Sequence, residues 1–451
     1  MKKTKRLSTT HWILLSFLSV ILLGSVLLWL PISSADGQSV SYIDALFTAT
    51  TSTCVTGLVT VPTLSTWSVF GQAVILVLIQ IGGLGVITVM AWFMLLVQRK
   101  MGLSRQLLIQ DAFNLTSRSD LGRFLRRVVI GTLTVESLGA LLCMTVFVPD
   151  FGAKGIWISV FHSISAFCNA GIDILSENSL CDYALNPTIN IVTSLLIIFG
   201  GIGYIVWWDV LRALKHFPKQ KLRCLRKLTL HSKVALSTTA LLLFGGGIAF
   251  FLLEYNNPLT MQNLGFWDRV QLSLFQSVTT RTAGFASLPQ QNLTNGSTVI
   301  SLLLMFIGGS PVGTAGGIKT VTLTVLIASA VSNIRGRQEV SLFRRQISRE
   351  AVGKATAVVS MSFFIVLIST VLLSVVTPAP LDHILYETVS ATATVGLSCN
   401  LTGSLQLMGK LIILVTMYLG RVGPISLAIA FNTRRTNPNI IQNPTEDISI
   451  G

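Results

Sequence analysis

Long apolar runs and shorter amphiphilic segments alternate along this chain. The long runs occupy residues 12–30, 69–97, 128–148, 189–210, 234–253, 298–331, 355–376 and 407–431. A helix needs roughly 20 apolar residues to cross the hydrocarbon core of a bilayer, which is about 30 Å thick. The pattern therefore predicts an all-α membrane protein with eight full spans.

One short segment lies between the two members of each successive pair of runs, at residues 42–53, 157–167, 267–280 and 383–392. At about 1.5 Å per residue, a helix of this length reaches only about halfway through the hydrocarbon. It must turn back, and non-helical backbone at that depth is tolerated only where it is buried in protein or lines a wet cavity. We therefore expect four re-entrant half-helices around a pore.

Composition and charge placement agree with a bilayer as the main partner. Apolar residues make up 51% of the chain and charged residues only 11%, whereas a water-soluble surface needs roughly a quarter of its residues charged. The net charge of +15 does not point to nucleic acid, because 27 of the 33 Lys and Arg are gathered at the termini and in the linkers between units, at residues 2–6, 99–127, 212–233, 335–354 and 434–435.

The basic segments also predict the orientation of the chain. The positive-inside rule places both termini and all three linkers between units in the cytoplasm, so the half-helices would enter from outside. The first run follows basic residues, as in a signal peptide. It is long enough to span, however, and no Ala-x-Ala site follows it, so we expect a retained helix.

A glycine-centred loop recurs four times, directly after the four short segments. The loop glycines are separated by 114, 113 and 112 residues, and a second glycine set follows each one. Each unit crosses the membrane twice, so all copies point the same way, which favours four parallel helix–pore loop–helix repeats in a pseudo-four-fold arrangement over inverted repeats. The predicted repeats are residues 1–98, 99–211, 212–333 and 334–435, followed by a tail at 436–451.

The four loops are candidates for an ion-selectivity filter. Rings of backbone carbonyls replace the hydration shell of potassium, glycine supplies unusual backbone angles, and the C-terminal ends of the half-helices favour a cation. No carboxylate occupies the loops, which disfavours a calcium-type acidic ring. We expect potassium to bind at Val55, Thr56, Gly57, Asn169, Ala170, Gly171, Thr282, Ala283, Gly284, Thr394, Val395 and Gly396.

Four charged residues fall within or beside the predicted spans, where charge is costly. Arg421 lies just below the expected filter, where it is either an electrostatic barrier to cations or a structural partner of an acidic group or of carbonyls. Lys319 ends a stretch of the sixth run that is too rich in glycine to stay helical. Glu136 in the third run and Arg281 beside the third loop are expected to pair and brace the filter.

Three motifs together resemble the TrkH/KtrB/HKT superfamily of potassium transporters. They are Thr-Cys-Val-Thr-Gly-Leu at 53–58, Arg-Thr-Ala-Gly-Phe at 281–285 and the stretch Gly-Gly-Ser-Pro-Val-Gly-Thr-Ala-Gly-Gly-Ile-Lys-Thr at 308–320. The resemblance covers essentially the whole chain. It is greatest to KtrB-type members, because the chain begins with the outer helix of the first unit, whereas TrkH-type members carry additional N-terminal helices.

This resemblance implies potassium uptake across a bacterial plasma membrane, with glycine in all four loops favouring potassium and serine in the first accompanying sodium permeation. It also implies a homodimer on a cytosolic ring of KtrA-like nucleotide-binding subunits controlled by ATP and ADP, with sodium as an activating ion. It makes the interrupted sixth run a gate, as opposed to a passive kink, formed by Gly308, Gly309, Ser310, Pro311, Gly313, Thr314, Ala315, Gly316, Gly317 and Lys319, with Arg421 beneath the filter.

Two other classes of transport protein stay open at this point. A secondary transporter coupled to protons or sodium would need binding residues at midplane and inverted halves, and a less selective monovalent cation channel would need only a small change in the loops. An enzyme is not expected, because the five histidines are scattered. No nucleotide-binding motif occurs in the linkers, so no tightly bound cofactor is expected either.

Overall fold

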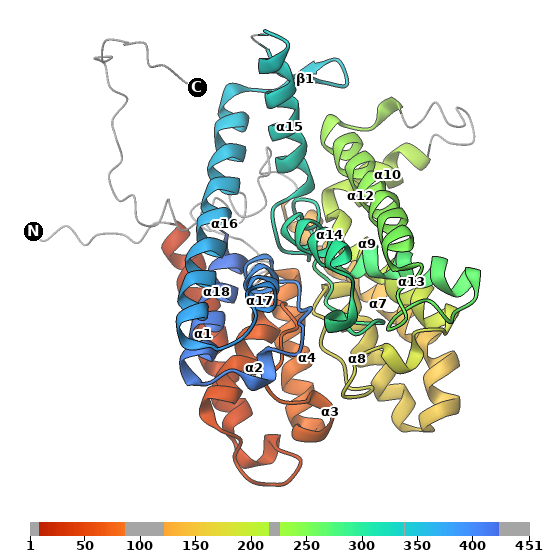
Figure 1. The fold of residues 1–451 in the computed structure, drawn as a ribbon, viewed down its shortest axis with the longest axis vertical. Coiled ribbons are helices and arrows are strands. Elements are labelled where there is room, and N and C mark those ends of the chain that lie inside the picture. Colours follow the sequence, from red (N-terminus) through yellow and green to blue (C-terminus); the bar gives the residue numbers. More distant parts are fainter. Residues whose placement is uncertain (1–8, 86–120, 216–225, 338, 424–451) are drawn as a thin grey trace, which may run out of the picture.

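The chain folds into helices that are joined by short loops (Figure 1). The computed structural model describes residues 9–85, 121–215, 226–337 and 339–423. The helices are α1 (Thr9–Trp29), α2 (Tyr42–Cys54), α3 (Thr63–Thr66), α4 (Val69–Leu84), α7 (Leu121–Phe151), α8 (Lys154–Cys168), α9 (Pro187–Ile202), α10 (Tyr204–Leu214), α12 (Leu230–Glu254), α13 (Phe266–Thr279), α14 (Asn295–Phe306), α15 (Thr320–Ile334), α16 (Arg349–Val376), α17 (Leu381–Ala393) and α18 (Leu407–Val422).

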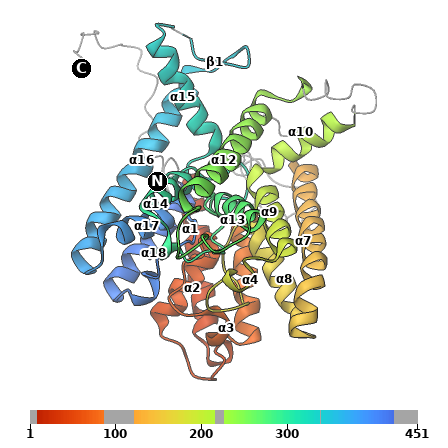
Figure 2. The same ribbon diagram turned by 45° about the vertical axis from the view of Figure 1, so that its right-hand side comes forward.

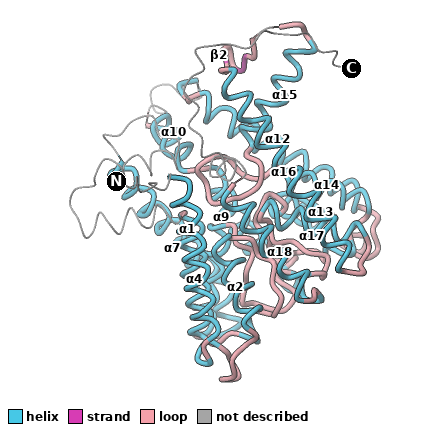
Figure 3. The backbone as a smooth tube through the Cα atoms, turned by 90° about the vertical axis from the view of Figure 1, so that its left-hand side faces the viewer, coloured by secondary structure: helices cyan, strands magenta, loops and turns pink. Residues whose placement is uncertain are grey.

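A small hairpin, β1 (Ser341–Leu342) with β2 (Arg345–Gln346), joins α15 to α16. These two helices pack together and project from the end of the molecule opposite α3 (Figures 1 and 2). Loop backbone also lies among the helices rather than only at the two ends of the molecule (Figure 3). The chain is therefore an all-helical protein with non-helical segments in its interior.

The short helices α2, α8, α13 and α17 are connected around a closed circle through other helices. Each packs against the long helix that precedes it, and each also packs against the last helices of the unit before it in the chain: α8 on α4, α13 on α9, α17 on α14, and α2 on α18. The last of these contacts joins the first unit to the fourth. This cyclic order supports the predicted ring of parallel repeats, whose full architecture stays a prediction.

The number of spans differs from the eight expected. Within the described residues three helices are long and apolar enough to cross a membrane, namely α7, α12 and α16, and the bent pair α9 and α10 would make a fourth. Four further helices are apolar but shorter. The runs at 69–97 and 407–431 extend outside the described residues, so the count of eight stays a prediction.

Apolar side chains cover the outside, while hydroxyl groups fill much of the interior. On α12, Leu241 and Leu252 are about 70% exposed, which a water-facing helix would avoid and a lipid-facing helix requires. On α2, by contrast, Thr50 and Ser52 are fully buried. Their hydroxyls donate to the carbonyls of Leu46 and Thr48 in the same helix, which satisfies them without a partner elsewhere.

The fourth apolar run is not the straight helix that its hydropathy predicted. It breaks at Gly203, where φ is +93°, and α10 leaves α9 at an angle of 100°. A Cβ atom at this position would collide with the carbonyl oxygen of Pro311. The next amide, that of Tyr204, donates to the carbonyl of Val312 at 3.0 Å. The bend thus accommodates the interrupted sixth run, which is non-helical between Phe306 and Thr320 as its composition predicted.

One ion pair closes the contact between the first and fourth units. Lys410 Nζ on α18 lies 2.6 Å from a carboxylate oxygen of Asp44 in the first turn of α2, and the two side chains are only 15% and 12% exposed. A carboxylate there is also favoured by the positive N-terminal end of α2. The pair therefore joins residues that are far apart in the chain, across the seam of the circle.

We expect Asp44→Asn to lower the free energy of unfolding by about 3 kcal/mol, because it leaves Lys410 charged and largely buried without its partner. Thermal unfolding of the purified protein in detergent measures this. The double variant Asp44→Asn/Lys410→Met should lose less than the sum of the two single variants. Glu350→Gln, which removes a fully exposed pair with Lys354, should leave stability unchanged; an equal loss in both variants would contradict the assignment.

Candidate functional site

The four glycine loops that follow the short helices share one backbone conformation. In each loop the residue two positions before the glycine is left-handed, with φ between +52° and +66°, and the glycine itself has φ between +63° and +103°. This holds in the third loop even though α13 ends earlier, at Thr279. The non-glycine residues with positive φ are Val55, Asn169, Thr282 and Thr394, and the glycines are Gly57, Gly171, Gly284 and Gly396.

These glycines meet each other at close range in chain order. A Cβ atom placed on Gly57 would lie 2.6 Å from the carbonyl oxygen of Ala170 and 3.1 Å from the Cα of Gly396. One on Gly171 would lie 2.7 Å from the Cα of Gly284 and an equal distance from the carbonyl oxygen of Ala283. The remaining two glycines meet in the same way, through the carbonyls of Val395 and Thr56. Backbone of four distant segments is thus brought to one place.

Eleven of the twelve predicted loop residues are buried and the twelfth, Gly396, is half-buried. Their surroundings are polar, and the twelve loop residues themselves carry no charged side chain. Since the short helices α2, α8 and α17 end directly at these loops, the negative ends of their dipoles lie next to the backbone carbonyls. The arrangement can stabilise a cation without any side-chain carboxylate.

A hydroxyl group near the end of each short helix fastens the loop that follows. Thr51 Oγ1 and Ser390 Oγ each accept from the amide of the loop glycine six residues later, both at 3.0 Å. Ser165 Oγ and Thr279 Oγ1 instead donate to carbonyls just past the glycine, those of Ile172 and Phe285. Sequence reasoning missed these four residues, although a hydroxyl five or six positions before each glycine was a visible signal.

The second glycine set lies against the ends of the short helices. A Cβ atom on Gly82, Gly200 or Gly420 would collide with the last carbonyls of the adjacent short helix, which are those of Thr53, Phe167 and Thr392 respectively. Glycine is therefore needed for the long helix to approach this closely. In the third unit the equivalent position, Gly308, meets Gly316 of its own loop instead.

The predicted gate residues lie in a segment that we name the break loop (residues 307–319). Its backbone docks on the end of α9: Ser310 N donates to the carbonyl of Gly201 at 2.8 Å, and Thr314 N to that of Gly200 at 3.1 Å. The ends of the break loop are joined by a bond from Gly308 N to the carbonyl of Ile318. The loop is therefore held by backbone hydrogen bonds on several sides.

The break loop also touches two of the glycine loops. Gly316 N donates to Thr282 Oγ1 at 3.1 Å, and Thr314 Oγ1 lies 3.1 Å from Asn169 Oδ1. The predicted gate and the predicted filter are thus in direct contact. Of the predicted gate residues, Gly308, Gly309, Ser310, Thr314, Ala315 and Gly316 are buried, and Pro311, Gly313, Gly317 and Lys319 are half-buried.

Two of the predicted charged residues bind carbonyl oxygens around the break loop. Lys319 Nζ donates to the carbonyl of Ala315 at 2.6 Å. Arg421 Nη1 donates to the carbonyl of Thr314 at 2.7 Å, and its Nη2 donates to that of Gly82 at 2.6 Å. Arg421 therefore joins the fourth unit, the first unit and the break loop, as a structural partner of carbonyls would. Its role as an electrostatic barrier to cations stays a prediction.

The expected pair between Glu136 and Arg281 is not formed. Glu136 on α7 accepts a hydrogen bond from Gln80 Nε2 at 3.2 Å and lies near the thiol of Cys168. Arg281 instead donates through Nη2 to the carbonyl of Gly308 at 3.2 Å. The prediction was wrong because a charge in a span shows only that a partner is needed, and an amide or a carbonyl can supply it.

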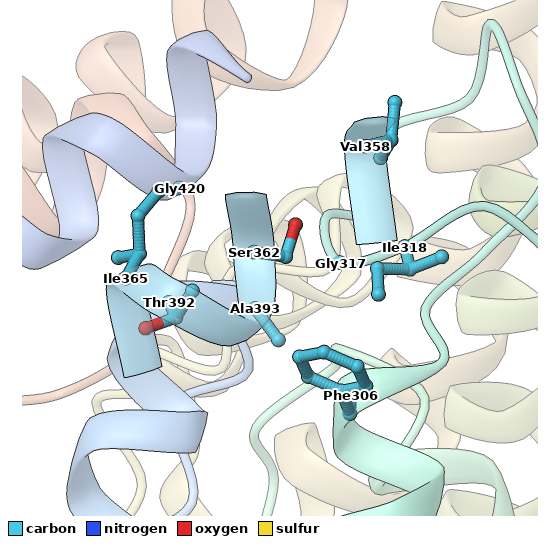
Figure 4. A pocket seen from close by; sticks show the side chains of 9 residues that line it. All are labelled: Phe306, Gly317, Ile318, Val358, Ser362, Ile365, Thr392, Ala393 and Gly420. Atoms are coloured by element: carbon cyan, nitrogen blue, oxygen red, sulfur yellow. The ribbon is translucent and has the colours of Figure 1, made fainter. Parts of the chain in front are cut away.

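A pocket of about 30 Å³ opens beside the break loop (Figure 4). Its walls come from the break loop, α16, the end of α17 and Gly420 on α18, and they are mostly apolar. Ser362 and Thr392 supply the polar groups. This volume has room for one or two water molecules and is too small for a larger molecule.

Comparison with known proteins gives a family match over most of the chain. The TrkH family model, described as a cation transport protein, matches residues 4–442. The chain is 39% identical to the potassium/sodium uptake protein NtpJ of Enterococcus hirae, over 99% of this chain and 98% of that protein. It is 38% identical to the Ktr system potassium uptake protein B of Bacillus subtilis, over 100% and 98%.

A solved structure has the same fold. The potassium transporter TrkH from Vibrio parahaemolyticus superposes with a TM-score of 0.77 at 16% identity, covering 96% of this chain and 87% of that chain. The matched family consists of cation transporters and not of enzymes. Because the family model spans nearly the whole chain and full-length relatives share more than a third of its residues, the chain belongs to the TrkH family of cation transport proteins.

Proposed function

We propose that this chain takes up potassium ions across the plasma membrane through a filter built from the backbone carbonyls of the four glycine loops. The observation that carries the proposal is the close meeting of Gly57, Gly171, Gly284 and Gly396. Carbonyl rings replace the water shell of potassium. Relatives of 39% and 38% identity are named as potassium uptake proteins, which supports the same ion here.

A less selective path for potassium and sodium is the second candidate. The name of the Enterococcus relative includes both ions, and selectivity between them depends on small differences in carbonyl geometry. Sodium as an activating ion accounts for the same name without permeation. Measurement of sodium and potassium uptake by the same protein distinguishes the two.

We further propose that the break loop is a gate and that a cytosolic nucleotide-binding ring of KtrA-like subunits, responsive to ATP and ADP, controls it. The contacts between Thr314, Gly316 and the glycine loops support a gate directly next to the filter. A relative's name assigns it to a Ktr system, which supports a partner subunit. The proposed assembly on this partner is a homodimer of this chain. The basic segments, with both termini, would face that partner in the cytoplasm.

Growth of a bacterium that lacks potassium uptake tests the function. We expect this chain, expressed with a nucleotide-binding partner, to restore growth at micromolar potassium, and the chain alone to restore it only at millimolar potassium. Rubidium or potassium tracer uptake measures the flux directly. Expression at the membrane without any gain in growth or uptake would refute the proposal.

Gly57→Ser should weaken the preference for potassium over sodium by roughly tenfold, equal to about 1.4 kcal/mol. The added Cβ would lie 2.6 Å from the carbonyl oxygen of Ala170 and must displace a neighbouring loop. Competition of sodium with tracer uptake measures the change. Gly37→Ser is the matched control, because Gly37 also has positive φ but nothing lies within 4 Å of its Cβ position; equal selectivity in both variants would count against the filter.

Arg421→Ala should raise flux and reduce its dependence on the partner, as should removal of several residues from 308–317. The substitution removes two bonds from a charged donor, each worth about 1.5–3 kcal/mol, so a change of at least about tenfold is expected. Arg269→Ala is the control, since the hydrogen bonds of Arg269 also go to backbone carbonyls, but its partners lie outside the break loop. A loss of stability without a change in gating would reduce Arg421 to a structural role.

A further inference from the structure

A small cavity lies behind the second and third glycine loops. Asn169 of the second loop, Arg281 beside the third loop and Thr239 of α12 contribute polar groups to its wall, and Gly201 and Gly309 contribute backbone. The cavity has a volume of about 10 Å³. This is about the volume that one particle of the size of a water molecule needs.

Three polar atoms on this wall have no hydrogen-bond partner. They are Asn169 Nδ2, Thr239 Oγ1 and Arg281 Nε, and their side chains are only 1%, 5% and 6% exposed. Buried polar groups in folded proteins are nearly always paired, so a cluster of three unpaired ones indicates a bound water or ion. Since the two nitrogen atoms can only donate, the particle must be an acceptor.

The orientation of Asn169 strengthens this reading. Its Oδ1 lies 3.1 Å from Thr314 Oγ1 of the break loop, whose single proton is shared between this oxygen and the carbonyl of Phe167 at 3.0 Å. Its Nδ2 is left near Gly201, 3.6 Å from where a Cβ of that glycine would be. The amide therefore presents a free N–H to the cavity while its oxygen contacts the break loop.

The guanidinium of Arg281 lacks a negative partner. Its one hydrogen bond goes to the carbonyl of Gly308, and Glu136 is bonded to Gln80 instead. Neither ion pair found in the described part of the chain includes Arg281. A charge that is buried in a protein is normally paired with an opposite charge.

We propose that this cavity binds one small monovalent anion, with chloride as the abundant example, as the counter-ion of Arg281. The anion accepts hydrogen bonds from Arg281 Nε, Asn169 Nδ2 and the hydroxyl of Thr239. A water molecule can accept hydrogen bonds from only two of these donors and would leave the positive charge uncompensated. The bound anion thereby removes a fixed repulsion of cations behind the glycine loops and links the second loop, the third loop and α12 through one particle.

Thermal unfolding of the full chain in detergent tests the proposal without any assay of transport. Chloride is replaced stepwise by gluconate at constant potassium and constant ionic strength. Because a ligand that binds only the folded protein raises its melting temperature with concentration, we expect the temperature to rise with chloride or bromide for the wild-type chain. Thr239→Val and Arg281→Gln should lose this rise.

Thr238→Val is the matched control, since Thr238 precedes Thr239 on the same helix and bonds Thr324 instead of lining the cavity. It should be less stable than the wild-type chain yet keep the full response to chloride. If Arg281→Gln does not fold, the comparison of Thr239→Val with Thr238→Val still decides the matter. An equal halide response in those two variants would overturn the proposal.

The position of the anion is tested by structure determination in bromide. We expect an anomalous bromide peak between Asn169, Thr239 and Arg281 in crystals of the wild-type protein, and its loss in Thr239→Val. Density for a water molecule alone at that position, with no bromide peak, would show that the cavity is a hydration site and would refute the anion. Neither result depends on whether the chain transports potassium.

Discussion

Backbone can approach backbone closely only where no side chain intervenes, and this steric limit decides how the four units fit together. The first glycine of each unit lets the four loops meet, because a Cβ on Gly57 or Gly171 would lie within 2.7 Å of a carbonyl oxygen of the next loop. The second lets a long helix lie on the end of a short one, as Gly82 does. Both contacts occur in one unit, so the loops and the helices around them are positioned together.

Bringing backbone into the interior creates a demand for hydrogen-bond partners, since no water is present in hydrocarbon. The chain meets this demand locally, with hydroxyls of the short helices such as Thr51 and Ser390. The break loop meets it with backbone bonds to Gly200 and Gly201 at the end of α9. For this reason the bend at Gly203 and the break loop are held together. Displacement of the loop must break these hydrogen bonds or replace them with bonds to other groups.

Much of this arrangement could be predicted from residue types and spacing. The short segments at 42–53 and 383–392 match α2 and α17 to within two residues at each end, because a length too short to span and a glycine at constant distance are both visible in a sequence. The 100° bend at Gly203 was not predicted, since hydropathy averages over a run and carries no information on φ. The partner of Glu136 was not predicted either, because helix rotation decides which side chain it faces.

Apart from the ion pair of Asp44 with Lys410, the buried charges discussed above divide by sign, and this division bears on how the break loop could move. Carboxylates are satisfied by neutral donors, as Glu387 is by the hydroxyls of Ser398 and Thr402. Cations are satisfied by carbonyls, and two of them, Lys319 and Arg421, depend on carbonyls of the break loop itself. If the loop leaves its position, both lose an acceptor in a region of low polarity, which costs more than the loss of a bond between neutral groups. If the break loop is the proposed gate, its opening therefore requires that water or another carbonyl reach these cations as the loop leaves its position.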